Sequence, residues 1–204
     1  YRGKILRVNL TEKSFKLEEL NLEEAMMYDG GRGLGTKIMY DEVDPLIDPF
    51  DPANKVIIAT GPITGTPSPA GGRYMVITKS PLTGTIASSN SGGFWGAELK
   101  FAGYDALILE GRSEKPVNIF IEDTKIEFRD AAHVWGKTTI ETTRALMKEA
   151  PDKAKVLCIG PAGENLSRIA GIMNDINRAA GRSGVGAVVG SKNLKAIVVR
   201  GTNR

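Results

Sequence analysis

"GGFWGAELKFAGYDALILEG" (residues 92–111) lies over "RSGVGAVVGSKNLKAIVVRG" (residues 182–201) without a gap, at a constant shift of 90 positions. The match sets Ala106 over Ala196 and places one apolar run over another at the end of each stretch. A repeat at a fixed spacing indicates a duplicated structural unit. The sequence therefore predicts two related halves with an internal pseudo-twofold axis.

Each half has the same order of elements: a strand, a glycine-rich turn, a short helix and a returning strand. "KVIIATGP" (residues 55–62) and "KVLCIGP" (residues 155–161) give the two first strands, and the turns are "ASSNSGG" (residues 87–93) and "NRAAGRSG" (residues 177–184). The first N–H groups of a helix lack intrahelical partners and carry the positive end of its dipole, so each turn is expected to bind an anion. Two such turns suit one ligand, or a pair of ligands, with pseudo-twofold symmetry.

The remaining chain combines hairpins with a few helices. Apolar and polar residues alternate in residues 3–20 and again in residues 117–130, which is typical of β-hairpins. Helices are expected at residues 22–28, 94–102 and 138–149. The last of these begins with the spacing of a capping box. Strands outnumber helices, so we predict an α+β fold of two related β-sheets with short helices.

Composition describes a globular protein and excludes several classes. The 204 residues carry a formal charge of +3, from 27 basic and 24 acidic residues that are mixed along the chain. No basic block indicates nucleic-acid binding, and no apolar run approaches the roughly 20 residues that cross a bilayer. No signal peptide is visible, so a cytoplasmic location is expected. The chain starts at Tyr1 and stops after a strand-like run, which favours a segment of a longer protein.

The familiar catalytic and nucleotide-binding patterns are missing. "GRGLGT" and "GVGAVVG" do not match the dinucleotide fingerprint G-x-G-x-x-G, and the sequence has no P-loop. The single cysteine, Cys158, excludes an iron–sulfur cluster held by this chain alone and is expected in a buried strand. The single histidine, His133, is expected to be structural or exposed, and no nucleophile–base set accompanies it.

Three arginines lie in stretches of glycine and alanine: Arg73 after a Gly-Gly pair, and Arg178 and Arg182 in "NRAAGRSG". Glycine lets the backbone approach a ligand closely, and a guanidinium group binds phosphate through two donors. We therefore expect these arginines to bind an anionic ligand, and we expect Arg178 and Arg182 to lack strong carboxylate partners and to be at least partly solvent-accessible.

Four long motifs resemble the N-terminal domain of aldehyde ferredoxin oxidoreductases. They are "ATGPITGTPSPAGGRYMVITKSPLTG" (residues 59–84), "SSNSGGFWGAELKFAGYDA" (residues 88–106), "GPAGENL" (residues 160–166) and "IMNDINRAAGRSGVGAVVGSKNLKAI" (residues 172–197). The resemblance covers nearly the whole chain. It implies that residues 1–204 are a single N-terminal, pterin-binding domain of a larger oxidoreductase, built from two intertwined related halves.

The resemblance also implies the cofactors. In this family tungsten, or sometimes molybdenum, is held by the dithiolenes of two pterins beside a [4Fe–4S] cluster, and the enzyme oxidises aldehydes to carboxylic acids. The pterin-contacting positions match Arg73, Asn90, Gly92, Arg178, Ala179, Gly181 and Arg182. A magnesium ion that bridges the two pterin phosphates is coordinated at the positions of Asn90 and Ala179, the latter through its carbonyl. Both provide the oxygen ligands that magnesium prefers.

The cluster-binding cysteines and the acid/base residues of the family belong to later domains, so this chain is expected to bind cofactor without turning over by itself. The implied partners are ferredoxin, the C-terminal domains of the same enzyme and a second copy in a homo-oligomer, with no nucleic acid and no membrane. Two alternatives stay open. One is a stand-alone phosphate- or nucleotide-binding module without catalytic activity, and the other is a subunit whose cluster comes from a partner chain.

Two further expectations concern the three-dimensional structure. The turns at Asn90 and Arg178 should lie close together, because a pseudo-twofold axis relates the halves. An apolar surface of several hundred Å² should lie beside them, with Phe94 and Trp95 at its edge, and it should favour self-association.

Overall fold

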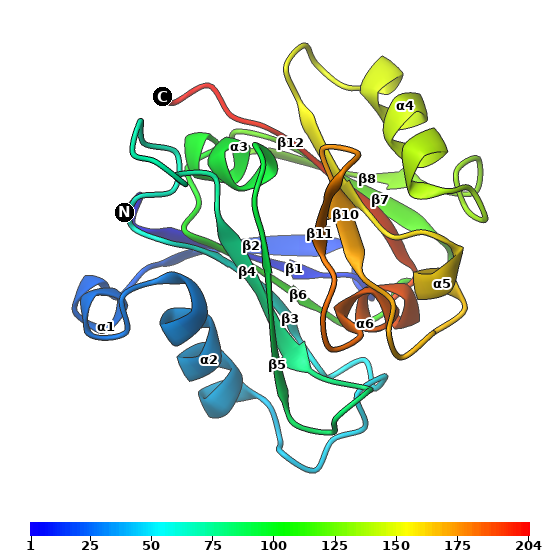
Figure 1. Ribbon diagram of the computed structural model, residues 1–204, viewed down its shortest axis with the longest axis horizontal. Coiled ribbons are helices and arrows are strands. Elements are labelled where there is room, and N and C mark those ends of the chain that lie inside the picture. The colour runs from blue at the N-terminus through cyan, green and yellow to red at the C-terminus, as the bar shows by residue number, and fades with distance from the viewer.

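The computed structural model describes all residues, 1–204, and contains two mixed six-stranded sheets with short helices (Figure 1). The first sheet is built from β1 (Lys4–Asn9), β2 (Ser14–Glu19), β3 (Val56–Thr60), β4 (Tyr74–Lys79), β5 (Ile86–Ser91) and β6 (Ala106–Glu110). The second is built from β7 (Val117–Glu122), β8 (Lys125–Asp130), β9 (Lys155–Cys158), β10 (Ile172–Asn174), β11 (Arg178–Ala180) and β12 (Leu194–Arg200). The helices are α1 (Leu22–Met27), α2 (Gly31–Glu42), α3 (Trp95–Phe101), α4 (Thr139–Glu149), α5 (Pro161–Glu164) and α6 (Val185–Ser191).

The two sheets have the same topology. The first has the strand order β2-β1-β6-β3-β4-β5, and the second, from its far edge, has the order β8-β7-β12-β9-β10-β11. Each contains one parallel pairing, β1 with β6 and β7 with β12, and all other pairings are antiparallel. The short helices α3 and α6 precede the equivalent strands β6 and β12. The predicted α+β fold with two related sheets is confirmed.

The main core lies between the two sheets. It is a cluster of 27 buried residues to which both sheets, α3 and α6 contribute. A second cluster packs α1 and α2 against the other face of the first sheet, and a third packs α4 against the other face of the second (Figure 1). The central strands of both sheets are therefore covered on both faces, which explains the apolar runs of β3 and β6. None of the helices is both long and apolar enough to cross a membrane.

Several local predictions are confirmed. Residues 3–20 and 117–130 form the hairpins β1–β2 and β7–β8. Helix α4 begins at the predicted capping box, in which Thr138 accepts the Glu141 N–H and the Glu141 side chain accepts the Thr138 N–H. Two satisfied N–H groups stabilise this helix start.

The prediction of a glycine-rich turn over residues 87–93 is largely wrong. Residues 86–91 form β5, which pairs with the whole of β4, so the turn is confined to Gly92, Gly93 and Phe94. Ala87, Ser89 and Ser91 are buried in the alternating pattern of a strand. Small side chains suit this position because β5 packs against β11. Such tertiary context overrides the low intrinsic strand propensity of these residues.

Helix α2 was not predicted, because glycines in "GRGLGT" are typical of a loop. The structure shows why a helix contains them. A Cβ on Gly33 would lie 2.0 Å from the Tyr28 carbonyl oxygen, and one on Gly35 would lie 2.5 Å from the Ile77 side chain. The absent side chains let the helix pack directly against preceding backbone and the first sheet.

Candidate functional site

The equivalent edge strands β5 and β11 meet at the centre of the molecule. The Arg182 N–H donates to Ser89 Oγ at 3.0 Å, and the Ser80 hydroxyl donates to the Ser183 carbonyl at 2.8 Å. From the other direction, Asn174 Nδ2 donates to the Gly92 carbonyl at 2.9 Å. The strands that carry Asn90 and Arg178 are therefore neighbours, as predicted from the repeat.

The sheet register makes Asn90 and Ala179 equivalent. The row of paired residues that starts at Asn90 continues through Met75, Ala59 and Ala106, and the row that starts at Ala179 continues through Met173, Cys158 and Ala196. The two rows end on Ala106 and Ala196, which the sequence repeat had already matched. Gly92 and Gly181 follow two residues after these positions in each half, one residue out of step with the sequence repeat, which sets Gly92 over Arg182.

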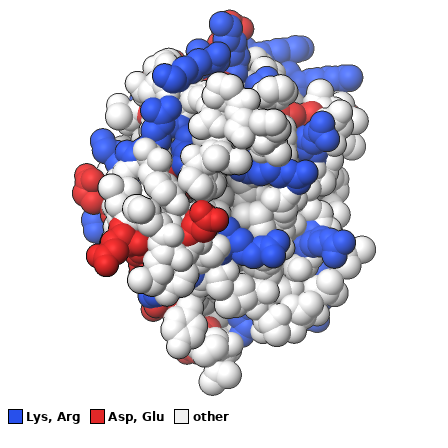
Figure 2. All heavy atoms as spheres, turned by 60° about the vertical axis from the view of Figure 1, so that its left-hand side comes forward, with Lys and Arg blue, Asp and Glu red and all other residues white.

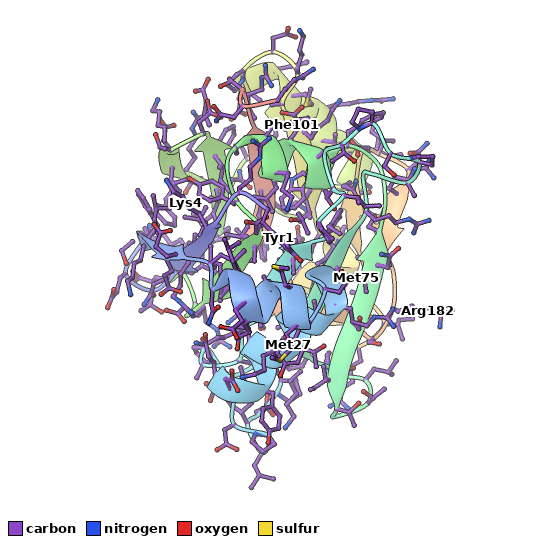
Figure 3. The ribbon with its side chains drawn as sticks, turned by 90° about the vertical axis from the view of Figure 1, so that its left-hand side faces the viewer. Tyr1, Lys4, Met27, Met75, Phe101 and Arg182 are labelled. Atoms are coloured by element: carbon purple, nitrogen blue, oxygen red, sulfur yellow. The ribbon has the colours of Figure 1, made fainter.

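A hollow of about 580 Å³ lies at this junction. Among the predicted residues, Arg73, Gly92 and Arg178 line it. Asn90 lies against it, since Arg73 Nη1 donates to Asn90 Oδ1. Ala179, Gly181 and Arg182 continue along the same edge outside the lining, and Arg182 projects from the surface (Figure 3).

The charges around the hollow are unbalanced. Arg73, Arg178 and Arg182 are exposed, and none is within 4.0 Å of a carboxylate oxygen. Figure 2 shows Lys and Arg side chains along the upper and right-hand parts of one face, while acidic side chains gather at its left. Unpaired guanidinium groups at a hollow attract anions. The prediction that Arg178 and Arg182 are solvent-accessible and lack carboxylate partners is confirmed.

Two glycines present open backbone to solvent. A Cβ on Gly92 would meet only Arg73 Nε, at 3.9 Å, and a Cβ on Gly181 would meet only the Ala179 Cβ, at 3.7 Å. Most other glycines in this region contact backbone more closely; a Cβ on Gly72 would lie 2.0 Å from the Gly93 carbonyl oxygen. Gly92 and Gly181 therefore leave room that folding itself does not require.

Part of each helix start that was predicted to bind an anion is occupied by groups of the protein itself. Asp175 Oδ2 accepts the Phe94 N–H at the start of α3, at 2.6 Å. At the start of α6, the Gly186 N–H donates to the Ala170 carbonyl at 2.9 Å. Each helix start therefore has at least one N–H group bonded within the protein, and the arginine side chains are free cationic groups at this junction.

Asn174 and Asp175 form a polar network that the sequence did not reveal. Asn174 Oδ1 accepts the Tyr74 hydroxyl at 2.8 Å and the Ser91 hydroxyl at 2.7 Å, and its Nδ2 donates to Asp175 Oδ2 at 2.8 Å. Burial raises the pKa of Tyr74, so its hydroxyl stays a donor. The signal was the polar pair within "IMNDIN", but its partners come from the other half of the chain.

Other predicted residues divide between confirmation and correction. Cys158 is buried in β9 as expected, and burial raises the pKa of its thiol to about 11. His133 is exposed, and its Nε2 lies 2.9 Å from Glu149 Oε1. Phe94 is 66% exposed, but Trp95 is fully buried, and its Nε1 donates to the Ile197 carbonyl. Trp95 therefore holds the halves together and is not part of an exposed apolar surface.

These features define a class: a duplicated two-sheet domain in which equivalent edge positions and unpaired arginines surround a hollow suited to an anionic ligand. Residues 5–201 match the family model described as "Aldehyde ferredoxin oxidoreductase, N-terminal domain". The chain belongs to the aldehyde ferredoxin oxidoreductase family.

Known relatives agree with this assignment. The chain is 60% identical over 205 residues to the tungsten-containing aldehyde ferredoxin oxidoreductase of Pyrococcus abyssi, which covers 100% of this chain and 34% of that protein. It is 38% identical to the aliphatic sulfonate oxidoreductase, WOR-like subunit, of Pyrococcus furiosus over 218 residues, which covers 99% of this chain and 35% of that protein. The chain thus spans about a third of the length of these relatives.

A solved structure has the same fold. It is the active site complex BamBC of benzoyl coenzyme A reductase with 1,5-dienoyl-CoA, which superimposes with a TM-score of 0.96 at 43% identity. The match covers 99% of this chain and 31% of that one. The family and structural matches agree with one another over nearly the whole chain.

Proposed function

We propose that residues 1–204 are the pterin-binding N-terminal domain of a tungsten- or molybdenum-pterin oxidoreductase. The whole enzyme would oxidise aldehydes to carboxylic acids and pass electrons through a [4Fe–4S] cluster, ligated by residues outside this chain, to ferredoxin. The single observation that carries the proposal is the equivalence of Asn90 and Ala179 beside three arginines without carboxylate partners. A ligand with two phosphorylated halves suits such a site.

The residues present fit the organic and phosphate parts of such a cofactor. No group of three or more His, Cys, Asp or Glu side chains is arranged to hold a metal ion. The free groups are guanidinium donors and open glycine backbone, which suit phosphate and a flat ring. We infer that the chain binds the cofactor through Arg73, Arg178 and Arg182 and through the surface of Gly92 and Gly181.

Magnesium would bind where the two halves offer oxygen atoms. Asn90 Oδ1 accepts a hydrogen bond from Arg73, and an amide oxygen has a second lone pair for a cation. The carbonyl of Ala179 is the equivalent ligand from the second half. Amide and carbonyl oxygens are suitable partners for magnesium, with phosphate oxygens completing its coordination.

The bound pterin metal supplies the redox chemistry, and this chain supplies position and charge. Arg73 adds a fixed positive charge at the hollow that stabilises electron-rich states nearby. Its contact with Asn90 orients both side chains. The later domains would supply the cluster ligands and the groups that move protons.

Metal, pterin and phosphate analysis of the full-length protein tests this proposal. We expect tungsten or molybdenum with two pterins per chain, and a clear loss of both in Arg178→Ala. Arg144→Ala is the matched control, because Arg144 is exposed on α4 and also lacks a carboxylate partner. A full-length protein without pterin, or equal metal content in both variants, would refute the proposal.

The partners of the whole enzyme are part of the same proposal. We infer contact with C-terminal domains of the same polypeptide, with ferredoxin and with a second copy of the chain. One relative is named as a subunit, and a variation in which the cluster comes from a separate chain is the alternative arrangement. Co-purification of an iron–sulfur protein would identify that arrangement.

A further inference from the structure

Asp175 is the one carboxylate among the residues that line the hollow. Its Oδ2 accepts the Phe94 N–H at 2.6 Å and the Asn174 amide at 2.8 Å, and it lies directly beside Gly93. A Cβ on Gly93 would come within 2.3 Å of this oxygen. A carboxylate in a hollow that attracts anions repels the ligand, so its place there requires another reason.

The three-residue loop that carries Asp175 has an unfavourable backbone. Asp175 and Ile176 both have positive φ angles, 47° and 66°, between the paired residues Asn174 and Arg178. A β-branched residue such as Ile176 rarely adopts this conformation, and such strain persists only where surrounding contacts hold it. The contacts of Asp175 with the first half provide that restraint.

Side chains of the first half also hold the turn of the second half. Ser89 of β5 accepts the Arg182 N–H at 3.0 Å, and Ser80 donates to the Ser183 carbonyl at 2.8 Å. Each ligand-facing turn is thus held by a side chain from the other half of the molecule. Residues 92–94 are held by Asn174 and Asp175, and residues 181–184 by Ser80 and Ser89.

We propose that Asp175 and Ser89 are positioning residues, each of which fixes the ligand-binding turn of the opposite half. The inference rests on the proposed function and deepens it. Asp175 acts through residues 92–94 and so fixes the positions of Gly92 and the adjacent Arg73. Ser89 acts through the backbone of Arg182. The Asp175 carboxylate also occupies the first free N–H of α3, so that the ligand is bound by arginine side chains instead of the helix start.

Variants of the full-length enzyme test the role of Asp175. Asp175→Ala removes the acceptor, whereas Asp175→Asn keeps an oxygen for the Phe94 N–H. The matched control is Asp130→Ala, because Asp130 Oδ1 accepts a backbone N–H, that of Ala132, at 2.8 Å in an exposed position remote from the hollow. We measure retained pterin and metal during dialysis, together with the melting temperature.

We expect Asp175→Ala to lose pterin about tenfold faster, the lower end of the effect of residues that orient ligands. Asp175→Asn should restore most of the retention, and Asp130→Ala should retain pterin like the wild type. Equal retention in Asp175→Ala and wild type overturns the inference, and so does an equal loss in Asp130→Ala. Wild-type enzyme without pterin would instead refute the proposed function itself.

Double variants test which turn each residue controls, and they decide the matter even where Asp175→Ala does not fold. Ser89→Ala combined with Arg182→Ala should deviate at least about twofold from the product of the single effects on retention, as residues in contact do. When Ser89→Ala is combined with Arg73→Ala, the effect on retention should equal the product of the two single effects. Asp175→Ala, where it folds, should deviate from the product when combined with Arg73→Ala and should multiply when combined with Arg182→Ala. Multiplicative behaviour of Ser89 with Arg182 overturns the proposed coupling.

Discussion

The two halves share their strand pairing but bury opposite charges at matched positions. Asp105, directly before β6, and Lys195, in β12, align in the sequence repeat, and both are fully buried. Asp105 accepts hydrogen bonds from the backbone N–H groups of Arg2 and Gly3, each at 2.7 Å, and it forms an ion pair with Lys100. The duplicated fold therefore fixes where a buried charge lies, while its sign follows from local partners.

Lys195 shows the complementary arrangement. Its ammonium group donates to the Lys137 carbonyl at 2.9 Å and pairs with the buried Glu164. In the first half the buried acid attaches the N-terminal segment, and in the second the buried base attaches the segment that precedes α4. Each half thus uses one internal ion pair to hold a neighbouring stretch of chain.

The surface facing the hollow differs between the halves in the same way. Arg178 has the register position that Ser89 has in the first half. The second half thus contributes Arg178 and Asp175 to the lining, with Arg182 beside it, whereas the first contributes Arg73, with the Asn90 amide beside it. Backbone positions remain symmetric and charge does not, so two similar ligand halves would be bound with unequal electrostatics.

The largest expected effect comes from breaking the buried ion pairs. Asp105→Asn and Lys195→Gln should each reduce the free energy of unfolding by about 3–5 kcal/mol, because each leaves a buried partner charge uncompensated. Denaturant titration of residues 1–204 measures both. If one variant loses less than about 1 kcal/mol, as is typical of an exposed pair, the two matched charges do not contribute equally to the free energy of unfolding.

The next largest effect is a pH dependence of stability that arises in the second half only. Burial lowers the pKa of Lys192 to about 7, with Arg112 and Lys55 lowering it further and Glu110 and Asp51 opposing them. Its match in the repeat is the uncharged Ala102. Between pH 7 and about 10 this residue carries a proton in the unfolded chain that it lacks in the folded chain, so its contribution to stability rises with pH, by at most ~1.4 kcal/mol per pH unit.

Lys192→Met should remove that rise, and the exposed Lys148→Met should keep it. The measurement is the free energy of unfolding across this pH range, compared as variant against wild type so that other titrating groups cancel. An unchanged slope in Lys192→Met would mean that Lys192 is protonated in the folded chain throughout.

A smaller effect is expected at the symmetric glycines. Gly92→Ala and Gly181→Ala should each leave the chain as stable as before or raise its stability by about 0.4–1 kcal/mol, since neither has positive φ and a Cβ meets open space. In the full-length enzyme both should lower pterin content, because the methyl group enters the ligand surface. Gly103→Ala, at φ 103° with open space, provides the contrasting control that should destabilise without affecting pterin.

The smallest effect should come from the arginines. Arg178→Ala and Arg182→Ala should each change the stability of residues 1–204 by only about 0.5 kcal/mol, as for surface residues. In the enzyme each removes a charge-assisted contact worth roughly 1.5–3 kcal/mol, so cofactor occupancy should fall. Thermal melts and tungsten content separate the two effects. Unfolding of the chain by Arg178→Ala would contradict a role in ligand binding.

Local patterns could predict much of this fold. The β-hairpins, the capping box of α4 and the 90-residue repeat depend on neighbouring residues or on self-similarity, and all three are visible in the sequence. Helix α2 was hidden because its glycines serve packing against Ile77, which is distant in sequence. Strand β5 was hidden because serines and alanine form a strand only where its neighbours require small side chains.

The candidate site was partly predictable for the same reasons. Unpaired arginines in glycine-rich sequence indicate an anion site by their composition alone. The contact of Asp175 with Phe94 joins residues that are 81 positions apart, so no local pattern reveals it. Likewise, Trp95 is buried in the core between the sheets and donates to Ile197 in the opposite sheet, 102 positions away in sequence.

The parallel pairing of β1 with β6 has a consequence for synthesis on the ribosome. It joins Ile5 to Ala106, so β1 emerges long before its inner neighbour exists. At roughly 5–20 residues per second, the β1–β2 hairpin waits about 5–20 s with one edge unpaired. Leu6 and Val8, which end fully buried, stay exposed beside that edge during translation. The nascent chain therefore passes through a period in which chaperones and neighbouring nascent chains compete for the place that β6 will take.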